Sequence, residues 1–155
     1  MKNLVVIVLI SVVLTFASFI KPQSTPDIIQ IEFADISIKC EQYKQKNYII
    51  NTNEEYQEIL SARSPHPVCG TYSLPIINFS KYTLLGMHVG SGGCNVIEGE
   101  HFITKNVKTD SIEFNMNIAK QGSCKMLFIF TAWCLIPKVE DTSKINFKVN
   151  STYKE

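Results

Sequence analysis

A succession of short alternating segments after residue 74 most narrows the folds open to this chain. In residues 111–120 every second side chain is apolar and the intervening ones are mostly polar; the apolar members are Ile112, Phe114, Met116 and Ile118. A period of two places them on one face of a strand, so one face is buried and the other meets water. Further strands are expected over 82–89, 96–104, 125–136 and 145–149. The apolar residues of 125–136 occupy both faces, which predicts a central strand.

The first part of the domain adds two more strands. Residues 28–39 are rich in β-branched and aromatic side chains, which are typical of a strand, and a bend is expected near Ala34. Residues 48–51 form a second, shorter strand. Many short strands with turns between them indicate a mainly antiparallel architecture.

One helix is expected, over residues 53–62. The preceding Thr52 and the later Glu55 have the spacing of a capping box, in which each side chain bonds to the backbone amide of the other residue. The helix should end before Pro65, because proline cannot continue it. The sequence therefore predicts a mainly β (α+β) fold over 28–155, a two-layer antiparallel β-sandwich-like domain with one short helix.

The N-terminal residues 1–20 have the layout of a secretory signal peptide. A short basic start precedes a nearly unbroken apolar stretch, which is followed by the small residues Ala17 and Ser18. The alternative is an uncleaved anchor, although an apolar stretch of about 17 residues is short for a bilayer. Residues 21–27 then form a flexible leader. We expect a bacterial protein that is secreted or periplasmic within the cell envelope, with no membrane span after cleavage.

All five cysteines follow the signal segment, and an exported chain normally oxidises its cysteines to disulfides. An odd number leaves at least one thiol free or paired with another chain. Cys94 and Cys124 each follow a glycine-containing turn at a strand end, so we expect a bridge between them. By elimination, Cys40 is expected to pair with Cys69.

The remaining cysteine, Cys134, is expected to be a buried and inert thiol. It lies on one face of the 125–136 strand with other apolar residues, namely Met126, Phe128, Phe130 and Ala132. Free cysteine packs as a small hydrophobic side chain in such a row.

No pattern typical of catalysis or metal binding stands out. His66 and Cys69 form a single H-x-x-C without a second pair, while His88 and His101 lie on separate expected strands. The 15 basic and 14 acidic residues are spread evenly, without the basic stripe that tracks phosphates. We therefore expect no catalytic residue, no cofactor, no metal and no nucleic-acid partner.

The candidate partner-facing loop consists of Ser91, Gly92, Gly93 and Asn95. Consecutive glycines permit positive φ and close approach of strands. A bridge at Cys94 would hold this tip in place.

Several segments follow one another in the order found in a known family. They are Asn53-Glu54-Glu55-Tyr56, Leu74-Pro75, residues 78–86, Gly90-Ser91-Gly92-Gly93-Cys94, and residues 133–138. Over residues 48–150 the chain resembles the protease-complex subunit PrcB C-terminal-domain family of small exported bacterial proteins. Asn78 stands where the family usually has aspartate, and Cys94 where it has tyrosine. The resemblance implies an accessory protein that binds and stabilises a surface protease, with no catalytic residue to carry over.

The expected function is a secreted or periplasmic, non-catalytic binding or assembly module, for example a protease-associated accessory protein with an exported protease as partner. Two alternatives stay open. A protease inhibitor would use the loop 64–73, with its proline-rich segment 65–69, or the 90–95 tip as its contacting element. A thiol-dependent enzyme would use Cys94 or the unpaired thiol, although the chain has no C-x-x-C motif.

Overall fold

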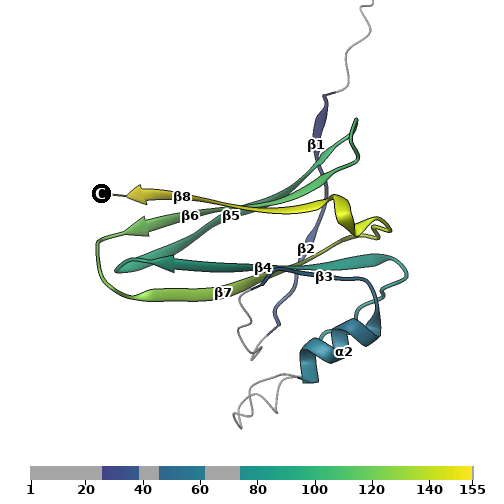
Figure 1. Cartoon of the computed structure of the whole chain (residues 1–155), viewed down its shortest axis with the longest axis horizontal. Coiled ribbons are helices and arrows are strands. Elements are labelled where there is room, and N and C mark those ends of the chain that lie inside the picture. Colours follow the sequence, from purple (N-terminus) through teal and green to yellow (C-terminus); the bar gives the residue numbers. More distant parts are fainter. Residues whose placement is uncertain (1–25, 39–45, 62–73, 155) are drawn as a thin grey trace, which may run out of the picture.

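The computed structural model describes residues 26–38, 46–61 and 74–154, and most of these residues lie in strands. Two four-stranded sheets pack face to face, with strand orders β1-β5-β6-β8 and β2-β7-β4-β3 (Figure 1). This is the expected mainly β (α+β), sandwich-like fold with one short helix in the described part of the chain. The elements are β1 (Ile28–Gln30), β2 (Ala34–Asp35), β3 (Tyr48–Ile50), α2 (Asn53–Ser61), β4 (Tyr82–Gly92), β5 (Asn95–Asn106), β6 (Ile112–Gln121), β7 (Leu127–Pro137), η2 (Thr142–Lys144) and β8 (Ile145–Lys154).

The centre of the domain is one long β-hairpin folded in half. Strand β4 pairs with β7 along the whole of both strands, and β5 pairs with β6 along nearly all of theirs. Between these two ladders, the Gly93 amide donates to the Met126 carbonyl and the Cys94 amide donates to the Gln121 carbonyl, at 3.2 and 2.9 Å. The double strand therefore passes from one sheet to the other at this bend, and each half forms the middle of one sheet.

The main core lies between the two sheets, where the alternation within β6 places it. The β6 residues Ile112, Phe114, Met116 and Ile118 all face this core, as predicted. From the opposing sheet, β4 contributes Leu85, Met87 and Val89, and β7 contributes Ala132, Cys134 and Ile136. Asn115 departs from the expected pattern, because it is buried although it alternates with the core residues. Its cross-strand neighbours are Phe102 and Lys148, whose long side chains flank it.

A second core covers the outer face of the β2-β7-β4-β3 sheet. Helix α2 lies against this face (Figure 1). Its Tyr56 packs against Phe79, with 5.6 Å between ring centroids, in the same cluster as the buried Trp133. Gly86 lies opposite Trp133, and a Cβ at this position would come within 2.5 Å of the indole ring. Only glycine lets the tryptophan lie flat against the strand at this point.

Two features of the topology differ from a simple reading of the sequence. The expected strand 28–39 is divided, because residues 31–33 cross between the sheets and place β1 in one sheet and β2 in the other. Strand β8 pairs with β6 in parallel, whereas the other described pairs are antiparallel. Strand β7 has already returned the chain to the end where β6 begins, so a neighbour of β6 that starts there must run parallel to it.

Candidate functional site

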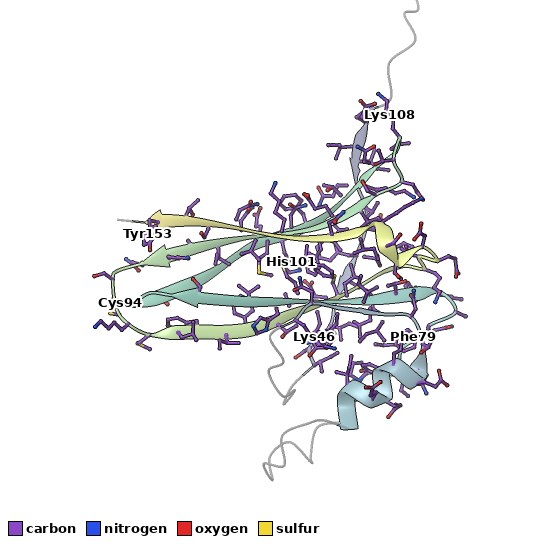
Figure 2. All side chains as sticks on the ribbon, in the orientation of Figure 1. Lys46, Phe79, Cys94, His101, Lys108 and Tyr153 are labelled. Atoms are coloured by element: carbon purple, nitrogen blue, oxygen red, sulfur yellow. A yellow bond between two sulfur atoms is a disulfide. The ribbon has the colours of Figure 1, made fainter. Side chains whose placement is uncertain are left out.

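The predicted disulfide joins Cys94 to Cys124, with 4.5 Å between the two Cα atoms. It lies at the bend of the folded hairpin, at one end of the sandwich (Figure 2). Gly122 has φ of 72°, and a Cβ there would overlap the Cys94 Sγ atom. The glycine is therefore needed both for the left-handed backbone and for access of the two sulfurs to each other. We call this bend, residues 91–95 and 121–127, the corner.

The candidate partner-facing loop is only partly available to a partner. Gly92 and Asn95 are exposed, as expected. Ser91 is 3 % exposed, so its side chain cannot form part of a contact surface. The alternation of β4 explains this correction, because Ser91 shares the inward face with Val89. Gly93 is also buried, and its backbone is used in the bond to Met126.

The corner also carries exposed apolar side chains that the sequence did not single out. Met126 and Leu127 lie on its second arm, and the Leu127 side chain is 68 % exposed. Tyr153, near the end of β8, is 76 % exposed and lies one strand away at Lys120, beside Gln121 of the corner. Figure 2 shows Tyr153 and Cys94 at the same end of the molecule. In the sequence, Met126 and Leu127 were part of an expected central strand over 125–136. In the structure, β7 begins only at Leu127, and both side chains are exposed.

A second cluster lies where the chain crosses between the sheets. The Nε2 atom of His101, on β5, lies 2.6 Å from Oδ1 of Asp35, on β2 of the other sheet. The imidazole is 17 % exposed and packs against the rings of Phe33 and Phe114, at centroid distances of 5.2 and 5.8 Å. Figure 2 shows His101 between the two sheets. The strand register of β5 shifts just before His101, and such a bulge can redirect a side chain.

An open cavity of about 440 Å³ adjoins this pair. Its walls come from residues 35–38, from 131–133 of β7, and from His101. The Asp35 side chain is 66 % exposed and its Oδ2 atom has no hydrogen bond among the described residues. The cavity therefore presents one free carboxylate oxygen to a ligand. Sequence alone could not find this cluster, since Asp35 and His101 are far apart in the chain.

The free thiol of Cys134 is buried in the main core, as predicted. Burial, with a smaller contribution from the charge of Asp35, raises the pKa of this thiol to about 12. The thiolate is therefore a minor species at neutral pH. The other two described cysteines, Cys94 and Cys124, are joined in the disulfide.

The described residues offer little else for chemistry. They contain no group of three or more histidine, cysteine, aspartate or glutamate side chains that could hold a metal ion. Among them, Asp35 is the one hydrogen-bond partner of the His101 ring. His88 and His101 lie in different sheets. The residues of the other expected features, namely 1–20, Cys40, His66 and the 65–69 loop with Cys69, lie outside the described part of the chain.

Comparison with known proteins found no matching family model, no matching curated protein and no matching solved structure. Within the described ranges, no helix has both the length and the apolar character needed to cross a membrane.

Proposed function

We propose that this protein is an exported, non-catalytic module that binds a protein partner through its corner. The observation that carries the proposal is the group of exposed apolar side chains at this end of the molecule: Met126 and Leu127 on the bend, and Tyr153 on β8. Aromatic and methionine side chains are enriched at the centres of protein interfaces. The N-terminal signal pattern supports export, and so does the disulfide, because such bonds persist in oxidising compartments.

The disulfide gives the corner a second property that suits binding. It joins the two arms of the bend, 30 residues apart in the chain, so the contact surface is ordered before a partner arrives. A preorganised surface loses less conformational entropy on association than a flexible loop does. The same bond leaves Cys94 without a free thiol, which weighs against the alternative of a thiol-dependent enzyme.

We further propose that the partner is an exported protease, for which this chain serves as an accessory subunit. This part rests on the resemblance to the PrcB C-terminal-domain family, in which the accessory protein binds and stabilises a surface protease. The alternative, a protease inhibitor, would use either the 64–73 loop or the 90–95 tip as its contacting element.

Affinity capture from the cell envelope of the native host tests the proposal. The tagged wild-type protein is compared with Leu127→Glu at the corner and with Ile76→Glu, a fully exposed position at the other end of β4. We expect wild type and I76E to retain one partner and L127E to lose about tenfold or more of it, since a charge in an apolar interface centre is costly. Equal recovery with L127E, or no specific partner, would refute the corner as the binding surface. Mass spectrometry of the retained protein decides whether it is a protease.

A further inference from the structure

The long edge of β7 is open over half its length in the described part of the chain. One side of β7 pairs with β4 from Leu127 to Pro137. On the other side, β2 pairs only with Leu135 and Cys134, and the Ile36 amide then donates to the Trp133 carbonyl at 3.0 Å. Beyond this bond the chain turns toward the second core, where Ile38 is buried. Among the described residues, no strand continues along β7 from Ala132 to Leu127.

The backbone groups on this edge can be assigned to individual residues. In an antiparallel ladder, successive residues direct their N–H and C=O groups to opposite sides of the strand. The backbone N–H and C=O groups of Trp133 point toward β2, because its carbonyl accepts a hydrogen bond from the Ile36 amide. The same backbone groups therefore point to that side in Thr131, Ile129 and Leu127. Those of Met126 point toward β4 and the corner, as the bond from the Gly93 amide to the Met126 carbonyl confirms. No described residue pairs with the backbone donors and acceptors of these three residues, which are in the register of a missing strand.

The sequence of this edge lacks the features that normally prevent strand pairing. Natural proteins protect edges with lysine, proline, bulges or covering loops. Residues 127–131 read Leu-Phe-Ile-Phe-Thr, with no charge and no proline. Gly90, which lies opposite Ile129 on β4, is exposed, and a Cβ there would meet nothing within 4 Å. The outer face beside Ile129 is therefore open as well.

The cavity at Asp35 lies where an added strand would begin. A peptide that takes up the line of β2 would run antiparallel to β7, starting beside Thr131 and ending beside Leu127. Its first residue would lie at the cavity, which contains the free Oδ2 atom of Asp35. A carboxylate there favours an ammonium or guanidinium group and disfavours an acidic one.

We propose that the edge of β7 binds an extended peptide by strand addition, and that Asp35, oriented by His101, receives a positive charge at the start of that peptide. The charge is the peptide's N-terminal amine, because a side chain opposite Thr131 would point to the outer face of the sheet, whereas Asp35, opposite Cys134, faces the other sheet. Main-chain hydrogen bonds to Thr131, Ile129 and Leu127 supply affinity, and Asp35 supplies selectivity. This site is separate from the corner, and it does not depend on the identity of the corner's partner.

Synthetic heptapeptides that alternate valine and threonine after the first residue serve as probes. The first residue is Lys, Gln or Glu, and each peptide is made with a free and with an acetylated N-terminus. Fluorescence anisotropy with the mature, oxidised protein should show tighter binding of each free-amine peptide than of its acetylated counterpart. The acetylated Lys peptide is the control for a basic side chain, and it should bind no more tightly than the acetylated Gln peptide.

Two variants, each with a matched control, test the roles of Asp35 and Ile129 in peptide binding. Asp35→Asn should weaken binding of the free-amine Gln peptide about three- to tenfold, the effect of one partly exposed charge-assisted hydrogen bond, and should abolish the preference for a free over an acetylated N-terminus. Asp27→Asn changes a carboxylate of similar exposure, paired with Lys108, and should have no effect. Ile129→Lys should prevent binding because it protects the edge, whereas Ile129→Thr should retain it.

Amide hydrogen exchange supplies an independent readout. The Thr131 and Ile129 amides should exchange rapidly in the free protein and become protected by the Lys peptide, while the Phe128 and Phe130 amides, directed toward β4, should be protected in both states. Protection of Thr131 and Ile129 without any peptide would overturn the proposal, because the edge would already be covered. So would binding that D35N and I129K leave unchanged, or a dimer of the free protein that I129K dissociates, since a second copy would then occupy the edge.

Discussion

Cys94 and Cys134 show how strongly the surroundings of a single residue decide its chemistry. Cys94 is exposed at the corner, where Gly93 and Gly122 let two chain segments approach closely enough for a disulfide. Cys134 has no exposed surface and lies among apolar side chains between the sheets. The transfer of a thiolate into such surroundings is costly, so the protonated form is favoured. One sulfur is therefore structural through a covalent bond, and the other through packing.

The burial of Cys134 predicts slow reaction with thiol reagents in the folded state. With the pKa raised to about 12, the folded protein at pH 8 should show no fast labelling at this position, and labelling should become rapid in denaturant. Time-resolved labelling with iodoacetamide, followed by peptide mapping, measures both rates. Equal rates with and without denaturant would contradict a buried thiol.

The raised pKa of Cys134 also determines in which direction the free energy of unfolding changes with pH. Because the folded pKa lies above that of the unfolded chain, the unfolded state loses the Cys134 proton first. The contribution is fully present below the unfolded pKa of about 9 and is lost as the pH rises toward 12. A Cys134→Ala variant should lack this loss.

At the scale of elements, α2 and β7 differ in how far local sequence determines them. The capping box of α2 forms as its spacing predicts: the Glu55 amide donates to Thr52 Oγ1, and the Thr52 amide donates to Glu55 Oε2, both at 3.2 Å. Strand β7 was expected to be central because both its faces are apolar. Among the described residues, it has neighbours on both sides only near Trp133 to Leu135, because β2 is two residues long.

Removal of the capping hydroxyl should destabilise the domain through α2. Thr52→Ala leaves the Glu55 amide without its acceptor, and we expect a loss of about 1 kcal/mol in the free energy of unfolding. Thr52→Ser keeps the hydroxyl and should restore most of that loss. Urea denaturation, followed by the fluorescence of Trp133, measures both variants. A T52A variant as stable as wild type would show that the box contributes nothing to the folded domain.

The whole molecule is organised by the fold of its central hairpin. At the corner, the hairpin passes between the sheets, and the disulfide links the two crossing segments there. Away from the corner, the sheets are joined by other means: residues 31–33 cross between them, and Asp35 and His101 connect them. Figure 1 shows the helix outside this sandwich, against the β2-β7-β4-β3 sheet.

Loss of the corner disulfide should weaken the whole domain rather than one strand. A bond that closes a loop of about 30 residues stabilises by about 3–4 kcal/mol in the chain-entropy model. The Cys94→Ser, Cys124→Ser double variant should therefore unfold at lower urea concentration, in a single transition seen by both fluorescence and circular dichroism. Its capture of a corner partner should fall as well. A change below about 1 kcal/mol would mean that the unfolded chain is not appreciably constrained by this bond.

Several features of the protein follow from the sequence by itself. The alternation in β6 places its core residues, the capping box places α2, and glycine before each cysteine indicated the Cys94–Cys124 bridge. These signals are local, because side-chain direction within a strand or helix depends only on backbone geometry. The inert character of Cys134 also followed from its row on β7.

Other features were decided only by the tertiary structure. The parallel pairing of β8, the division of 28–39 between two sheets, and the contact of His101 with Asp35 depend on which strands become neighbours. The burial of Ser91 and the exposure of Leu127 depend on it as well. Periodicity predicts on which face of a strand a side chain lies, but not which element packs against that face. That choice is made by long-range packing of the folded hairpin, which no short segment of sequence records.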